Sequence, residues 1–144
     1  MGRINIHLHG VTKEKAYSEM LEVYNQRLSQ RNITITSHSD KKSVEDYYNQ
    51  LNKNSILYIL DERGKQYTSI ELAGLVKEWG MSTDDINVAV GPVDGWDQFG
   101  VNHSPKRIIS LSNMTFPHEL ASVILAEQIY RSTEILKGTK YHRD

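Results

Sequence analysis

The chain has 144 residues, of which 38% are hydrophobic and 24% charged, and none is a cysteine. This composition predicts one globular domain, residues 1–144, and excludes disulfides, thiolate metal sites and a cysteine nucleophile. With no cysteine, no signal peptide and no apolar run long enough to span a membrane, the cytoplasm is the expected compartment. The formal net charge of −1 argues against a free-standing nucleic-acid binder, unless basic residues cluster or an assembly presents the RNA.

Short apolar runs alternate with amphipathic helical patterns along the chain. Alternating apolar and polar side chains predict the first strand, and the continuous apolar run 56–60 is typical of a strand covered on both faces. A turn is expected at 61–64. The predicted strands are residues 4–9, 33–36, 56–60, 86–90 and 107–111, and the predicted helices are residues 13–31, 43–51, 69–79 and 118–136.

Capping residues set the expected helix boundaries. Thr12 and Ser43 precede the first two helices, and we expect their side chains to cap them. Thr68 and Glu71 have the spacing of a capping box at the start of the third helix. The glycines expected to end the last two helices are Gly80 and Gly138.

Strands that alternate with helices predict an α/β fold with a parallel sheet. In such sheets ligands bind outside the carboxyl ends of the strands, where we expect the loops 60–62, 91–95 and 112–115. Gly91 and Gly95 would let a ligand approach the backbone closely, or they form an ordinary turn. The loop lacks the glycine pattern of a dinucleotide site and the lysine of a phosphate loop, so a nucleotide triphosphate is not expected.

The segment LSNMTFP at 111–117 leaves the last strand and enters the longest helix. Its backbone could read an adenine edge while Met114 and Phe116 pack on something flat, or both side chains belong to the core. The helix 118–136 is apolar on more than one side, which is typical of a buried helix. We expect one face to meet the sheet and another to meet a second copy of the chain; a single buried helix in a monomer is the alternative.

Two groups of polar side chains have alternative interpretations. Tyr141, His142 and Arg143 near the end of the chain suit RNA, by stacking on a base and pairing with phosphate, although a solvated tail is the alternative. His7 and His9 lie on one face of the first strand, a spacing compatible with a metal. No carboxylate accompanies them, so polar histidines at a strand end are favoured and no metal is expected.

Several segments, in fixed order, resemble the SPOUT-class methyltransferases of the RlmH type. The similarity is close over residues 56–144, and the first half matches in element order. Any one of the segments alone is a weak signal, but their joint presence and order are specific. They are LDERGKQYTS at 60–69, VGPVDGW at 90–96, LSNMTFPHEL at 111–120, EQIYR at 127–131 and the terminal YHRD.

This resemblance implies a SPOUT fold: a parallel sheet flanked by helices, with a C-terminal trefoil knot, in a homodimer that packs through the C-terminal helix. It implies S-adenosylmethionine as cofactor and methylation of N3 of a pseudouridine in large-subunit ribosomal RNA, on assembled ribosomes. Carried over by position, the cofactor-binding residues are Leu60, Gly91, Leu111, Ser112, Asn113, Met114, Thr115 and Phe116, and the residues on the substrate side are Arg131, Tyr141, His142 and Arg143.

The substrate-side residues have hypothetical roles in this reaction. His142, whose imidazole can accept or donate a proton, would accept the N3 proton or orient the base. Arg131 or Arg143 would stabilise negative charge on the ring carbonyls, and Tyr141 would stack on the flipped base. Under the resemblance, the tail of one subunit helps to complete the site of the other.

The sequence departs from the family pattern at Pro92, where a second glycine is usual, at Ser122, where an arginine is usual, and in the stretch HSDKKS at 37–42. These departures leave two alternatives open. The chain could be a catalytically inactive dimer that binds RNA or the cofactor, or a methyltransferase with a different RNA target.

Overall fold

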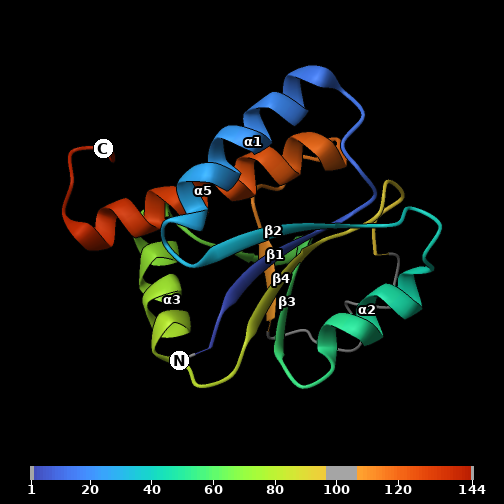
Figure 1. Cartoon of the computed structure of the whole chain (residues 1–144), viewed down its shortest axis with the longest axis horizontal. Helices are drawn as coiled ribbons and strands as arrows, with labels where there is room; N and C mark the ends of the chain where they lie inside the picture. The colour runs from blue at the N-terminus through green and yellow to red at the C-terminus, as the bar shows by residue number, and fades with distance from the viewer. Residues whose placement is uncertain (1, 97–106, 144) are drawn as a thin grey trace.

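Five parallel strands in the order β2-β1-β4-β3-β5 form the centre of the computed structural model, which describes residues 2–96 and 107–143 (Figure 1). All the strand pairings are parallel, so the predicted α/β fold class is confirmed. The strands are β1 (Ile4–His9), β2 (Ile33–His38), β3 (Ile56–Gln66), β4 (Ile86–Val90) and β5 (Ile108–Ser110), and the helices are α1 (Lys15–Ser29), α2 (Val44–Asn52), α3 (Ser69–Met81) and α5 (His118–Lys137).

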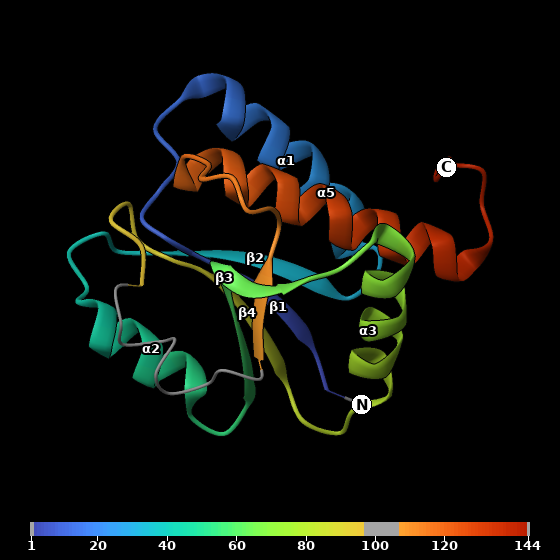
Figure 2. The ribbon, with the colours of Figure 1, turned by 180° about the vertical axis from the view of Figure 1, so that it is seen from behind.

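Helices cover the two faces of the sheet unequally. Within the described ranges, α1, α3 and α5 pack on one face and α2 packs on the other (Figures 1 and 2). The alternation in β1 fits this arrangement, because Ile4, Ile6 and Leu8 enter the larger core beneath α1 and α5. On the opposite face, His9 contacts Tyr47 of α2.

Strand β3 is longer than predicted. The expected turn at 61–64 is wrong, because the chain continues in extended form and the last two residues of β3 pair with Ile109 and Ser110 of β5. The pairing changes register between Leu60 and Lys65. Leu60 and Lys65 both pair with Ile109, so residues 61–64 lie between two paired stretches of β3, at the edge of the sheet where ligands bind.

Helix caps are predicted with mixed success. Ser43 accepts a hydrogen bond from the backbone of Asp46, and Thr68 and Glu71 form a capping box, so both predicted caps are confirmed. The predicted stop at Gly80 is wrong, because α3 continues through it to Met81. A glycine ends a helix only where the backbone turns left-handed, and Gly80 is not among the residues with positive φ.

The predicted cap of α1 by Thr12 is also wrong. Helix α1 begins after Glu14, which makes no side-chain capping bond. The carboxylate of Glu119, at the start of α5, accepts hydrogen bonds from the backbone N–H groups of Lys13 and Glu14 at 3.2 and 3.1 Å. The side chain of Glu119 therefore accepts from backbone N–H groups that the sequence suggested Thr12 would cap.

Helix α5 ends at Gly138 as predicted, with φ of 73° in the left-handed region. Its side chains Val123, Leu125, Ala126 and Ile129 are buried in the core of this one chain. Residues of α5 that are not in the core are mostly half-buried, so the predicted contact with a second copy of the chain stays a prediction. No helix in the described ranges is both long and apolar enough to span a membrane.

The trefoil knot depends on how the chain passes from β4 to β5. Strand β5 lies beside β3, on the far side of it from β4. Part of the connection, residues 97–106, lies outside the described residues. The knot therefore stays a prediction.

Candidate active site

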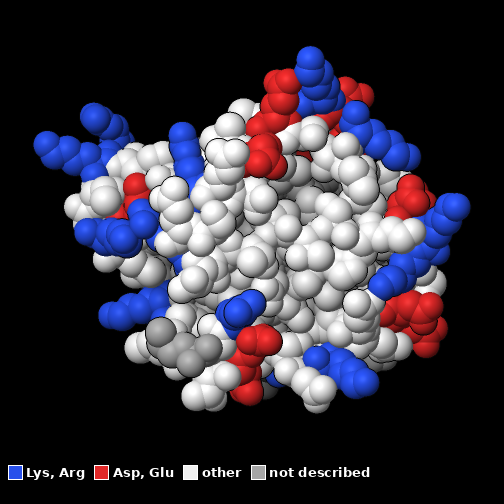
Figure 3. Space-filling model, viewed as in Figure 1, with Lys and Arg blue, Asp and Glu red and all other residues white. Residues whose placement is uncertain are grey.

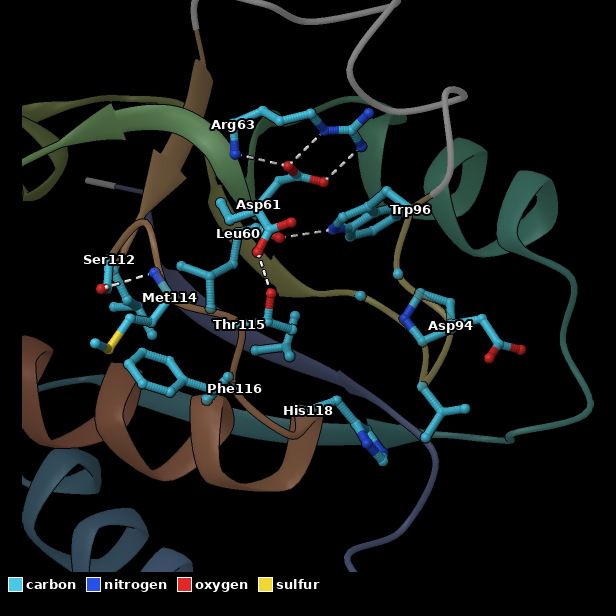
Figure 4. A pocket seen from close by; sticks show the side chains of 18 residues that line it. Leu60, Asp61, Arg63, Asp94, Trp96, Ser112, Met114, Thr115, Phe116 and His118 are labelled. Atoms are coloured by element: carbon cyan, nitrogen blue, oxygen red, sulfur yellow. Dashed lines mark hydrogen bonds and ion pairs between the residues drawn. The ribbon is translucent and has the colours of Figure 1, made fainter.

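A cavity of about 350 Å³ lies beside the register shift of β3 and the carboxyl ends of β4 and β5 (Figure 4). Cofactor and small-molecule sites have volumes of this order. The three loops predicted to meet at this edge all contribute to its wall. The lining residues are 60–63, 90–96, 111–112, 114–116, 118 and 121.

The predicted cofactor residues, with one exception, line this cavity. Asn113 does not; its side-chain oxygen accepts a hydrogen bond from Gln66 Nε2 at 2.7 Å and ties the third loop to β3. Met114 is 73% exposed at the mouth, so it is not a core residue. The predicted residues that line the cavity are Leu60, Gly91, Leu111, Ser112, Met114, Thr115 and Phe116.

Trp96 forms a rigid part of the wall. Its indole Nε1–H donates to the carbonyl oxygen of Leu60 at 3.0 Å, and its ring stacks on Tyr47 of α2. A Cβ atom on Gly91 would lie only 2.9 Å from Trp96 Nε1. Glycine is therefore required at position 91 by the close approach of the indole ring.

Carboxylates gather at the rim of the cavity. The side chain of Asp61 is 8% exposed, and its two oxygens accept hydrogen bonds from the guanidinium of Arg63, both at 2.9 Å. Burial acts to raise the pKa of Asp61, but the hydrogen bonds and charge of Arg63 outweigh it and hold the pKa below its usual value. Glu62 accepts a hydrogen bond from Thr115 Oγ at 2.6 Å, which links the first loop to the third.

The two departures from the family pattern lie in different environments. Pro92 lines the cavity, and its carbonyl oxygen accepts from the backbone N–H of Gly95 at 2.8 Å, which closes a turn. Ser122 is 2% exposed, and its hydroxyl donates to the carbonyl oxygen of His118. In this chain Ser122 therefore lies inside the fold and does not present a polar group at the surface.

The substrate-side residues come together around a carboxylate that the sequence interpretation missed. Tyr141 Oη and Arg131 Nη2 each donate to Glu127 Oε2 at 2.8 Å. The Arg131 guanidinium lies 5.0 Å from the centre of the Tyr141 ring, and its Nη1 is 3.2 Å from His142 Nδ1. Burial, together with the hydrogen bond to Glu127, raises the pKa of Tyr141 above its usual value. Arg143, the fourth predicted residue, is exposed.

The terminal residues and the cavity lie at opposite ends of α5. His118, the first residue of α5, lines the cavity, and the terminal residues follow the other end of the helix (Figure 1). Arg131, which contacts the terminal residues, follows His118 by 13 positions, a distance of about 20 Å along the helix. Within one chain, the structure therefore does not bring the predicted substrate-side residues to the predicted cofactor residues.

The histidines of β1 belong to a hydrogen-bonded network. His7 lies 2.8 Å from His38 Nε2 and 2.9 Å from Asn87 Oδ1, and His9 Nε2 lies 2.6 Å from the carbonyl oxygen of Lys42. The described residues contain no group of three or more His, Cys, Asp or Glu side chains arranged to hold a metal ion. The favoured interpretation, polar histidines near a strand end, matches these contacts.

Sequence reasoning placed Glu62 in a ligand-binding loop without a role of its own, and it missed Trp96 and Glu127 as site residues. Each lies inside a segment that carries the family resemblance, so position in a motif was the available signal. Their hydrogen-bond partners lie between 4 and 53 residues away in the sequence. Only the pair Glu127 and Arg131 has a spacing, that of one helical turn, which a local pattern could indicate.

Comparison with known proteins agrees with this geometry. The family model described as "Predicted SPOUT methyltransferase" matches residues 2–142. A curated relative from Prochlorococcus marinus, named ribosomal RNA large subunit methyltransferase H, is 37% identical over 99% of this chain and 97% of its own length. A relative of the same name from Koribacter versatilis is 37% identical over 92% of each chain.

A solved structure supports the fold. The crystal structure of a Bacillus anthracis protein, presented as an RNA methyltransferase, covers 91% of this chain and 94% of its own, with a TM-score of 0.54. The two sequences are only 12% identical, so this likeness concerns the arrangement of helices and strands.

Proposed function

Because this chain belongs to the SPOUT methyltransferase family, we propose that it transfers a methyl group from S-adenosylmethionine to large-subunit ribosomal RNA in the cytoplasm. Relatives that align over nearly the whole chain carry the name ribosomal RNA large subunit methyltransferase H. The observation that carries the proposal is the cavity built by three strand-end loops that the family resemblance had assigned to the cofactor.

The residues of the cavity fit this cofactor. When bound, S-adenosylmethionine supplies a methyl group activated by a positively charged sulfonium sulfur. The rim of the cavity carries the carboxylates of Glu62 and Asp94, which complement positive charge. Leu60, Leu111 and Phe116 provide apolar surface for an adenine ring, and the backbone of the loop 111–116 offers polar groups along its edge.

The terminal residues would serve the cavity of a second subunit. Within one chain the 13 residue steps of α5 from His118 to Arg131 separate the two groups by about 20 Å. A homodimer that packs through α5 would let the terminal residues of each chain reach the other cavity, so the proposed active site needs two copies. The apolar side chains of Leu120 and Ile124, which stay partly exposed on α5, support such a contact.

The proposed target atom is N3 of a pseudouridine, as the family resemblance implies. The contact with Arg131 bears on the role of His142 there. Arginine nitrogens only donate hydrogen bonds, so His142 Nδ1 accepts in this pair and the neutral imidazole carries its proton on Nε2. In this tautomer His142 donates a hydrogen bond and orients the base, which favours orientation over proton acceptance. Tyr141 would stack on the base, and Arg131 would stabilise charge on its carbonyls.

The natural substrate would be an assembled ribosomal subunit. The net charge of −1 gives the chain little general attraction for RNA, so a structured assembly must present the target. We therefore expect little methylation of protein-free transcript.

Two measurements test this function. Calorimetry with S-adenosylmethionine should show binding at one site per chain, and its absence would favour a non-enzymatic binding protein. Mass spectrometry of ribosomal RNA from cells with and without the gene should then show one methylated pseudouridine that disappears with the gene. If the methylation of large-subunit RNA is unchanged and another RNA loses a methyl group, the enzyme has a different RNA target.

A further inference from the structure

Basic residues gather where α1 and α5 finish. We call this surface the basic end and define it as residues 24–32 and 127–143. It is the end that carries the C-terminus, and Figure 3 shows Lys and Arg side chains clustered there. Its Lys and Arg residues are Arg27, Arg31, Arg131, Lys137, Lys140 and Arg143.

Only two carboxylates belong to the basic end, and both are paired. Glu134 accepts from Arg31 at 2.7 Å, and Glu127 accepts from Arg131 at 2.8 Å. The whole chain has 17 Lys and Arg and 18 Asp and Glu, so the rest of the molecule is clearly acidic. The nearly neutral net charge therefore conceals a strong separation of charge.

Arg27 is held by aromatic rings. Its guanidinium carbon lies 5.5 Å from the centre of the Tyr24 ring and 5.3 Å from that of Tyr130. Within the described ranges no carboxylate forms an ion pair with Arg27. Its N–H groups are therefore not engaged by a carboxylate of this chain. A planar, exposed guanidinium backed by aromatic rings is well suited to bind phosphate. Tyr130 in turn contacts Tyr141, which connects Arg27 to the terminal residues.

We infer that the basic end docks the phosphate backbone of RNA next to the proposed target nucleotide. This inference rests on the proposed function, because it concerns the RNA that the terminal residues would address. Exposed cations on two helices would neutralise phosphates on either side of the nucleotide. Under this inference Arg27 of α1 contacts the RNA, so the first half of the chain also takes part in substrate binding. In that half the family resemblance is limited to the order of the helices and strands.

Two triple variants with the same change in net charge test this docking surface. The first combines Arg27→Gln, Lys137→Gln and Lys140→Gln, and none of these residues belongs to the proposed catalytic set. The matched control combines Arg3→Gln, Lys41→Gln and Lys53→Gln, all exposed and outside the basic end. Binding to purified large ribosomal subunits, and to protein-free ribosomal RNA at low salt, is measured across a series of KCl concentrations. Circular dichroism and calorimetry with S-adenosylmethionine check the folding of both.

The first triple variant should bind subunits on the order of 10–100-fold more weakly at low salt, with the slope of log affinity against log salt reduced by about two to three. The control should bind like the unmodified chain. Equal losses in both variants, or no loss in the first, would overturn the inference. Lost affinity for subunits with unchanged affinity for protein-free RNA would indicate an acidic ribosomal protein as the partner and would also overturn it.

The outcome separates the docking surface from the proposed activity. If the unmodified chain transfers no methyl group but the first variant still loses RNA affinity, the docking surface stands and the activity does not. If the unmodified chain methylates RNA and the first variant binds as well as the control, the activity stands and the docking surface does not.

Discussion

At the amino end of α5, backbone segments from three strands surround a cavity, whereas towards its carboxyl end contacts between side chains hold most of the terminal residues in place. The first site is fixed by the sheet and by Trp96, which bonds to Leu60. The second is centred on the carboxylate of Glu127, which accepts hydrogen bonds from both Arg131 and Tyr141. The shape of the first site is therefore set largely by backbone, whereas that of the second is set by side chains.

The largest expected effect comes from removing the terminal residues 141–144. Methyl transfer should fall by about 10²–10⁴-fold, the range typical for loss of groups that position or polarise a reacting base. Affinity for S-adenosylmethionine should not change, because none of residues 141–143 lines the cavity formed by the described residues. Single-turnover assays and calorimetry measure the two quantities, and retained turnover would contradict the proposed role of these residues.

The second largest effect is expected on the affinity of the cavity for S-adenosylmethionine. In a Gly91→Ala variant the added Cβ would lie 2.9 Å from Trp96 Nε1, so the indole must move and its bond to Leu60 weakens. Overpacking of this kind costs about 1–3 kcal/mol, and affinity for S-adenosylmethionine should fall about 10-fold or more. Gly74→Ala is the matched control, since nothing lies within 4 Å of a Cβ there. Equal cofactor affinity in both variants would show that Trp96 does not shape the binding site.

These two ends also differ in how far the sequence predicted them. Short β-branched runs followed by Gly, Ser or Asn located the three loops, because strand ends in a parallel sheet meet at one edge. The extension of β3 past residue 60 was missed, since it depends on pairing with Ile109 and Ser110, which follow much later in the chain. The cap of α1 by Glu119 and the contact of Tyr141 with Glu127 join side chains across long or irregular separations, which no periodic pattern reveals.

A smaller effect is expected from Glu127→Gln, which removes the charge that holds Arg131 but keeps the shape. Hydrogen bonds to charged groups contribute about 1.5–3 kcal/mol, so kcat should fall about 10-fold while the Kd for S-adenosylmethionine stays constant. The exposed Glu45 of α2 supplies the control variant Glu45→Gln. If both variants have the kcat of the unmodified chain, Glu127 does not position the terminal residues.

The smallest expected effect is on the stability of the fold at acidic pH. Burial, with the nearby positive charges of His7, Lys42 and His9, lowers the pKa of His38 to about 4. The unfolded chain therefore binds more protons than the folded chain between pH 4 and about 6.5, and the free energy of unfolding falls as the pH decreases through that window. A His38→Asn variant should lose less Tm between pH 7 and pH 4 than the unmodified chain. Parallel melting profiles for the two proteins would exclude this histidine as a source of acid sensitivity.

Complementation between two inactive variants tests most directly the claim that one cavity works with the terminal residues of another chain. One variant, Ser112→Arg, places a long side chain in the cavity, and the other lacks residues 141–144. Co-expressed and mixed at random, the two should recover about a quarter of the unmodified activity, because half of the dimers would contain one complete site. If each cavity instead uses its own terminal residues, the mixture will be as inactive as either variant alone, and the proposed two-chain site will be wrong.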